Sequence, residues 1–177
     1  MNKKRAEELA APSALKTRGI VHPHPKYVLM IICVPVNLKQ LFKRQRNYPW
    51  PRPGTCPQCN VSGLWGHGFV LAYFDELPAG VFLRRFRCPH CGCVIRLRPS
   101  GFFHRFQASI ATIRTSLTSR LAGGGYLPGI SVSRQRHWLN GLTRNVMAHL
   151  GIPWRYRLLE GFDYLAALGH LPVSSAV

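Results

Sequence analysis

The sequence predicts an α+β protein, in which a small zinc-ribbon β domain is followed by a helical, degenerate helix-turn-helix-like domain. Two matched cysteine pairs predict the ribbon, and short apolar runs separated by turn residues predict its strands. Beyond Phe106 the apolar residues recur at intervals of three and four, which predicts helices. We therefore expect a flexible basic arm (1–26), a short strand with a basic and aromatic linker (27–54), a zinc ribbon (55–100), a helical DNA-binding region (101–150), and a C-terminal helix and tail (151–177).

The run YVLMIICVPV, residues 27–36, follows the polar and basic arm. It has about half of the roughly 20 residues that a membrane-spanning helix needs, and Pro35 interrupts it. We therefore expect a buried strand, with Cys33 in the core, and no membrane span. The N-terminus carries two glutamates where a signal peptide needs an apolar stretch, so we expect a cytoplasmic protein with reduced cysteines.

A basic and aromatic segment, KQLFKRQRNYPWPRPG, comes next, and its prolines favour an extended end. Basic side chains interleaved with aromatic ones suit a phosphate chain with stacked bases, which makes Lys43, Arg44 and Arg46 candidate nucleic-acid contacts. A linker whose aromatic residues pack on the next domain explains the same composition equally well.

The cysteine pairs are the most specific signal in the chain. Cys56 and Cys59 form one C-P-x-C unit, and Cys88 and Cys91 form a second, with 28 residues between the two units. Two such turns facing each other supply the four thiolates of a tetrahedral zinc site, so we expect one structural Zn²⁺ per chain on these four residues. Asn60 and Gly92 follow the second cysteine of each pair, and both residue types tolerate the left-handed conformation that such a knuckle needs.

Other metal chemistries and other ligands stay open at this stage. An iron–sulfur cluster, a redox dithiol and unligated core cysteines are the alternatives to zinc. Cys93 shares a strand face with Ile95 and Leu97, so we expect a buried thiol that is no ligand. We expect His90 to be exposed at the knuckle tip, and His67 would replace a cysteine only if one were absent.

The ribbon strands are expected in LWGHGFVLAYF, VFLRRFRC and VIRLR, with the turn DELPAG between the first two. The last two strands alternate apolar and basic residues in part, which is typical of short strands with one wet face. We expect that face to contact phosphates through Arg84, Arg85, Arg87, Arg96 and Arg98.

Three helices are expected after the ribbon. The first runs from Phe106 to Leu121 and ends at the glycines of AGGGY, and the last lies within residues 154–169. The middle helix, Ser133 to Leu150, is expected to bury Leu139, Leu142, Val146 and Leu150 and to turn Arg134, His137, Asn140, Gly141 and Arg144 outward.

The segment ISVSRQRHWLNGL is typical of a recognition helix, with a serine cap and hydrogen-bond donors in the first turns. The preceding GGGYLPG opposes the short helix that a complete helix-turn-helix requires. A degenerate motif and a packed helix with a basic surface therefore both remain open. On the first interpretation the nucleic-acid contacts are Arg134, Arg136, His137, Asn140 and Arg144.

The charge distribution indicates a polyanionic partner. The chain has 24 Lys and Arg against 6 Asp and Glu, a net charge of +18, and residues 77–159 carry thirteen arginines and no carboxylate. Nucleic acid is the commonest polyanion that relieves such repulsion. A ribosome-associated basic protein fits the same charge.

Taken together, the C-P-x-C knuckle, LWGHGFV, RFRCPHCGCVIRLRPSGFF, HRFQASI and SRQRHW resemble zinc-ribbon and helix-turn-helix proteins of unknown function found with transposases and integrases of bacterial mobile elements. The resemblance covers about residues 47–150, and its specific parts are the cysteine pairs and the arginine-rich strand. It implies a DNA-binding accessory or targeting module, with zinc on the four cysteines and a transposase or integrase as partner. The GGGYLPG segment departs from this pattern.

We expect no catalysis by this chain alone. A transposase of the RNase-H-like kind needs three carboxylates for two metal ions, whereas this chain has six acids, two of them in the arm. Duplex DNA is the favoured partner over RNA. An RNA-binding or ribosome-associated zinc ribbon and a protein-interaction module are the alternative functions.

Overall fold

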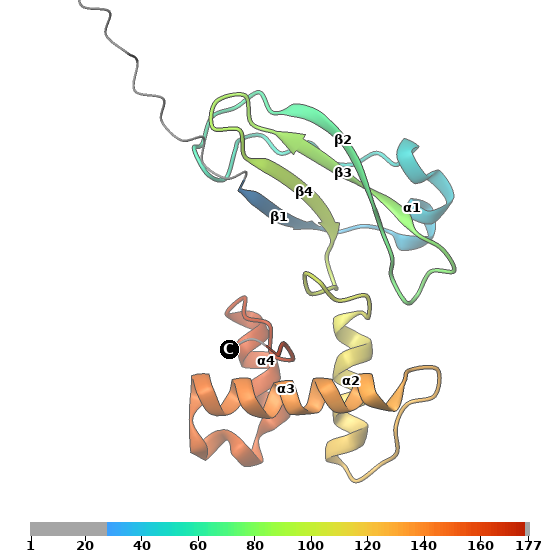
Figure 1. The fold of residues 1–177 in the computed structure, drawn as a ribbon, viewed down its shortest axis with the longest axis vertical. Helices are drawn as coiled ribbons and strands as arrows, with labels where there is room; N and C mark the ends of the chain where they lie inside the picture. Colours follow the sequence, from blue (N-terminus) through green and yellow to red (C-terminus); the bar gives the residue numbers. More distant parts are fainter. Residues whose placement is uncertain (1–27, 176–177) are drawn as a thin grey trace, which may run out of the picture.

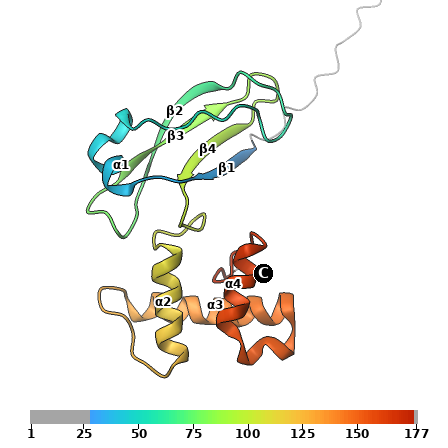
Figure 2. The same cartoon turned by 180° about the vertical axis from the view of Figure 1, so that it is seen from behind.

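The computed structural model describes residues 28–175, so the arm expected at 1–26 lies outside the described residues. The fold is α+β, with a four-stranded mixed sheet in one part and a helical region in the other (Figures 1 and 2). A short segment after the last strand joins the two parts. The sheet and the helical region therefore lie on opposite sides of this connecting segment.

The sheet consists of β1 (Leu29–Val34), β2 (Trp65–Ala72), β3 (Val81–Arg87) and β4 (Val94–Pro99) in the order β1-β4-β3-β2. Strands β2, β3 and β4 form an antiparallel meander, which confirms the three strands expected for the ribbon. Strand β1 pairs with β4 in parallel and forms one edge of the sheet, although it precedes the first knuckle in the sequence.

The position of β1 at this edge corrects one expectation. Cys33 is exposed and does not lie in the core. Side chains alternate along a strand, and at this edge Met30, Ile32 and Val34 pack on the core while Leu29 and Cys33 project from the other face.

The linker contains a helix that the sequence reasoning missed. Helix α1 (Leu38–Arg44) is followed by the 3-10 turn η1 (Gln45–Asn47). The side chain of Asn37 caps α1 by accepting a hydrogen bond of 3.0 Å from the Gln40 N–H, and Leu41 is fully buried. Beyond η1, residues 49–53 form neither helix nor strand.

Two apolar clusters support the sheet. The first contains Phe86, Cys93, Ile95 and Leu97 beside the first cysteine of each knuckle, which confirms that Cys93 turns inward with its strand. The second contains Leu41 of α1 together with Leu83, Phe102 and other apolar residues.

The helical region consists of α2 (Ile110–Leu121), α3 (Val132–Leu150), the 3-10 helix η2 (Ile152–Tyr156) and α4 (Leu158–Ala167). The side chains of Ser109 and Ser131 cap α2 and α3. Helix α2 therefore begins four residues later than expected, and Phe106 lies in the preceding loop. The buried residues of this region include Ile113, Leu117, Trp138, Leu142, Val146, Phe162 and Leu165.

The buried face of α3 differs from the expected one. Trp138 and Gly141 are buried, whereas Leu139 is only half-buried. Gly141 was expected to face outward, but the C-terminal segment crosses α3 at this point. A Cβ on Gly141 would lie 2.5 Å from the carbonyl oxygen of Val173, so only glycine allows this approach.

Candidate metal centre and basic surfaces

The four predicted cysteines form one candidate metal site. The sulfur atoms of Cys56, Cys59, Cys88 and Cys91 all lie within 4.8 Å of one another. The Cys56–Cys91 and Cys59–Cys88 sulfur distances are 3.6 Å and 3.5 Å. A tetrahedral Zn²⁺ with bonds of about 2.3 Å has sulfur–sulfur edges of about 3.8 Å, so the donor set fits a single ion of this size.

The two knuckles have the same backbone geometry. The N–H of Asn60 donates to the carbonyl of Cys56 over 2.8 Å, and the N–H of Gly92 donates to that of Cys88 over 3.1 Å. Asn60 and Gly92 have φ of 59° and 73°. The left-handed conformation predicted for both residues is thereby confirmed, and it turns the paired thiols toward a common point.

The first cysteine of each knuckle has a lowered pKa. Burial raises the pKa of Cys56, but backbone N–H groups of Cys59 and Gln58 and the neighbouring thiols lower it to about 7 overall. The pKa of Cys88 is lowered by the backbone N–H of Cys91, against an opposing effect of burial. Backbone donors therefore offset the charge of one thiolate in each knuckle.

The second cysteine of each knuckle has a raised pKa. The N–H of Val61 lowers the pKa of Cys59, yet burial and the neighbouring thiols raise it to about 12 overall. The pKa of Cys91 is also raised, because burial and two of the other thiols outweigh the N–H of Cys93. A divalent cation held by these four residues would stabilise all four thiolates and favour the loss of their protons.

Neighbouring candidates stand outside the cluster. Cys93 is 1% exposed, and burial raises the pKa of its thiol to about 11. His90 is exposed, as expected, and His67 lies on β2 outside the cluster. Within residues 28–175 no other group of three His, Cys, Asp or Glu side chains is arranged to hold a metal ion.

The sulfur spacing also bears on the alternatives to a mononuclear site. A disulfide has a sulfur–sulfur bond of about 2.05 Å, far below the 3.5 Å and 3.6 Å found here. A cluster with several irons and bridging sulfides needs more room between the thiolates than one ion does. The geometry therefore favours a single metal ion.

The five arginines predicted on the sheet divide between its two faces. Arg85 lies directly opposite Arg96, and Arg87 and Arg98 follow by alternation on the same face. Arg84 lies on the other face, where its guanidinium covers the rings of Phe69 and Phe86 at 4.7 Å and 5.5 Å.

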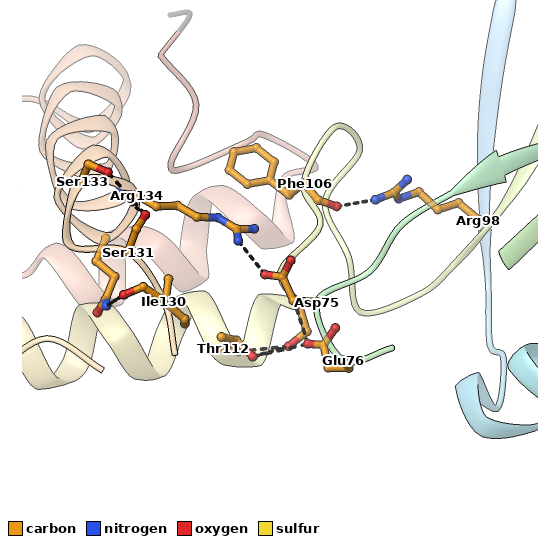
Figure 3. Close-up of polar contacts among 11 residues, drawn as sticks. Asp75, Glu76, Arg98, Phe106, Thr112, Ile130, Ser131, Ser133 and Arg134 are labelled. Carbon is orange, nitrogen blue, oxygen red and sulfur yellow. Dashed lines mark hydrogen bonds and ion pairs between the residues drawn. The ribbon is translucent and has the colours of Figure 1, made fainter. Parts of the chain in front are cut away.

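Arg98 ties the two parts of the molecule together. Its guanidinium donates a hydrogen bond to the carbonyl of Phe106 (Figure 3). Arg98 is 8% exposed, and its guanidinium lies 5.0 Å from the ring centre of Phe74. Burial lowers the pKa of its guanidinium. An arginine held in this way has little surface left for a phosphate, so Arg98 is not one of the exposed basic residues.

The loop between β2 and β3 makes a second connection. Asp75 forms a 2.7 Å ion pair with Arg134 of α3. Glu76 accepts hydrogen bonds from the N–H of Ser109 and the hydroxyl of Thr112, at the start of α2 (Figure 3). The sequence predicted only a turn at these two acids. Their position directly before a long segment with many arginines and no carboxylate could have indicated a specific ion pair.

A buried amide fixes the loop between α2 and α3. The side-chain oxygen of Gln135 accepts from the N–H of Leu127 and the hydroxyl of Ser116, and its NH₂ donates to the carbonyls of Leu127 and Ile130. All four hydrogen-bonding positions of the amide are thus used. The ten residues between α2 and α3 form an ordered loop, which is longer than the turn of a helix-turn-helix.

The first turn of α3 is therefore occupied by internal contacts, because Arg134 pairs with Asp75 and Gln135 is buried. The predicted residues that stay exposed on α3 are Arg136, His137, Asn140 and Arg144. Arg144 also donates a 2.6 Å hydrogen bond to the carbonyl of Ser175. On α1, Lys43 and Arg44 are exposed, and Arg46 lies over the ring of Phe82 at 4.4 Å.

Each of the four carboxylates within residues 28–175 has a partner inside the molecule. Besides Asp75 and Glu76, Asp163 pairs with Arg114 over 2.8 Å, and Glu160 pairs with Arg157. The same part of the chain contains eighteen of the 24 Lys and Arg residues. Most of its positive charge thus has no carboxylate beside it.

Comparison with protein-family models, with curated proteins and with solved structures gives no match for this chain. Within the described ranges no helix has both the length and the apolar character that crossing a membrane requires. The site must therefore be interpreted from its own chemistry.

Proposed function

We propose that this protein is a zinc-stabilised DNA-binding accessory factor. The observation that carries the proposal is the charge arrangement, in which the few carboxylates are used in internal ion pairs and caps while exposed basic side chains gather on α1 and α3. Such a surface is complementary to a polyanion and releases counterions when a polyanion binds.

The metal in this proposal is one structural Zn²⁺ per chain. Cys56, Cys59, Cys88 and Cys91 would hold it, and their close sulfur spacing supports that assignment. Zinc bound there supplies cross-linking energy between the two knuckles and no reaction chemistry, because four thiolates leave no open position for water. The chain would then present a rigid ribbon whose orientation to the helices is fixed by Arg98 and the Asp75–Arg134 pair.

Helix α3 is the proposed reading element. Arg136, Asn140 and Arg144 recur at intervals of four, so they lie one above another on an exposed face, with His137 beside them. Arginine pairs with guanine or with phosphates, and asparagine pairs with adenine in the major groove. Because Arg134 is paired with Asp75, the middle of α3 is better suited to the duplex than its first turn.

The exposed basic residues of α1 and the arginines of the sheet serve as further phosphate contacts in this proposal. Lys43, Arg44 and Arg46 project from α1 and η1, and Arg85 and Arg96 lie on one face of the sheet. Phosphate contacts position a protein on DNA and carry no sequence information themselves.

The resemblance to proteins found with transposases and integrases suggests a biological setting. A DNA-binding module without catalysis of its own would target a transposase or integrase, which supplies the strand-transfer chemistry. The internal pairing of the four described carboxylates supports this division of labour, since two-metal chemistry needs carboxylates aimed at metal ions. We place the protein in the reducing cytoplasm, where thiols remain available for zinc.

Competition binding tests the proposal against its RNA-binding alternative. Zinc-loaded protein is bound to a labelled 20-base-pair DNA duplex and challenged with unlabelled duplex DNA or duplex RNA of the same length. The proposal expects DNA to compete better, and it expects Arg136→Gln to weaken DNA binding more than Arg155→Gln, an equal charge change on η2. Preferential competition by RNA would support the ribosome-associated alternative and contradict the proposal.

A further inference from the structure

A groove of about 840 Å³ lies between the β1–β4 edge of the sheet and the helical region. Leu29 and Ile31 of β1 and Arg96 of β4 line it on the sheet side, and the register places Ile31 directly beside Arg96. The segments 100–105 and 169–171 line it on the other side. Both parts of the molecule thus contribute to one concave surface.

A second hollow of about 570 Å³ continues from this groove. The two share Arg105, Gly169, His170 and Leu171. His137, which lies on the exposed face of α3, also lines the second hollow. A continuous path therefore runs from the sheet to the proposed duplex-binding helix.

The lining of this path is basic. No Asp or Glu within residues 28–175 lines either hollow. The rings of His149 and His170 lie 4.7 Å apart between centres, at an angle of 33°. The basic side chains along the path are Arg96, Arg98, His104, Arg105, His137, His149 and His170.

A pair of arginines on the groove side of the sheet adds a specific argument. Arg85 and Arg96 are cross-strand partners, and like charges placed directly opposite each other destabilise a sheet. The Nε atoms of both side chains are buried and have no hydrogen-bond partner among the described residues. An anion bound in the groove beside Arg96 would relieve the repulsion between the two arginines.

The positive charge around Arg105 favours the binding of an anion in the groove. Burial lowers the pKa of the adjacent His104, and the charges of Arg105 and Arg98 lower it further. Arg105 itself has φ of 71°, a conformation that is uncommon for a residue with a side chain. Its backbone thus departs from the ordinary conformations at the point where the two hollows meet.

We propose that this groove binds a single-stranded segment of nucleic acid next to the duplex held by α3, an inference that rests on the proposed function. Both hollows have volumes within the range of small-ligand sites, about 300–1,000 Å³, which a double helix would exceed. Phosphates of one strand would contact Arg96, Arg105 and His170 in this basic groove. The bases would bury apolar surface against Leu29 and Ile31. The preferred ligand is then a duplex with a single-stranded overhang.

The test compares three labelled DNAs with the zinc-loaded full chain at 0.15 M salt: a single strand, a blunt duplex, and the same duplex with an overhang. We expect the overhang to bind more tightly than the blunt duplex. For a single strand, each lost phosphate contact reduces the salt slope by about 0.7, which corresponds to about fourfold at 0.15 M. Arg105→Gln should therefore weaken the single strand and the overhang by about fourfold and leave the blunt duplex unchanged.

Two further variants control this result. Arg155→Gln removes the same charge from η2, outside the groove. It should change the affinities for the three DNAs by the same factor. Arg96→Gln should weaken single-strand binding about fourfold and raise the melting temperature, because it removes the repulsion with Arg85. A purely structural role of Arg96 would instead lower the melting temperature.

The outcomes separate this inference from the proposed function. Equal effects of Arg105→Gln and Arg155→Gln, or an overhang bound no better than the blunt duplex, would overturn the groove assignment while duplex binding stands. Failure to bind any of the three DNAs would overturn the proposed function itself. Binding of polyglutamate that depends on Arg105, without binding of single-stranded DNA, would assign the groove to an acidic protein partner and contradict the inference.

Discussion

Replacement of Gly141 by alanine tests how the C-terminal segment is held on α3. In an open helix this change raises the free energy of unfolding by about 1 kcal/mol, because glycine is the poorer helix former. Here the new Cβ would lie 2.5 Å from the carbonyl oxygen and 2.7 Å from the carbonyl carbon of Val173. Both atoms belong to the backbone, so the whole segment has to move.

The magnitude follows from the contacts that this movement breaks. The side-chain NH₂ of Asn145 donates to the carbonyls of Pro172 and Ser174 over 3.0 Å and 2.9 Å, and losing the two bonds costs about 2 kcal/mol. Val173 is fully buried, and its partial exposure adds about 1 kcal/mol. With the helix-propensity gain subtracted, Gly141→Ala should lower the free energy of unfolding by about 2 kcal/mol.

Urea unfolding followed by far-UV circular dichroism measures this difference. The matched control is Gly125→Ala in the loop before α3, where a Cβ meets nothing within 4 Å and little change is expected. A Gly141→Ala protein as stable as the wild type, or more stable, would refute the reasoning and show that the segment does not cross α3 at this point.

Three further predictions concern the metal site, the helix contacts and the loop. Cys88→Ser should abolish stoichiometric zinc binding, whereas Cys93→Ser should retain one zinc per chain by elemental analysis; loss of zinc from the second variant would mean that the ligands are misassigned. The hydrogen bond from Arg114 lowers the pKa of Asp163, so the pair stabilises the fold above the ordinary carboxyl pKa, and this contribution is lost as the pH falls through the lowered value. Asp163→Asn should therefore reduce the melting temperature slightly at pH 7 and not at pH 2, and an equal reduction at both pH values would contradict a role of the ion pair. Gln135→Leu should lower the free energy of unfolding by about 2–3 kcal/mol, because it leaves buried donors and acceptors of the loop unpaired; unchanged urea unfolding would show that the amide does not fix the loop.

The two cysteine knuckles were predictable because their determinants are local. The C-P-x-C spacing, the left-handed residues Asn60 and Gly92, and the alternation that buries Cys93 are each encoded within a few residues. Helix positions in the second half followed in the same way from apolar spacing and serine caps.

The features that were missed depend on contacts between distant segments. Nothing near β1 specifies that it pairs with β4, some 60 residues later in the chain, and this pairing exposes Cys33. The buried face of α3 was misjudged at Gly141 because the segment that covers it lies about 30 residues downstream. The partnership of Asp75 with Arg134 is equally nonlocal, and it removes one predicted DNA contact from the exposed surface.

The salt dependence of duplex DNA binding tests the central claim most directly. Zinc-loaded protein is titrated with a blunt duplex at several salt concentrations, and the logarithm of the association constant is plotted against the logarithm of the salt concentration. With ~5–8 phosphates contacted, the account predicts a slope of about −4.5 to −7. A slope near zero, or no binding at low salt, would contradict it.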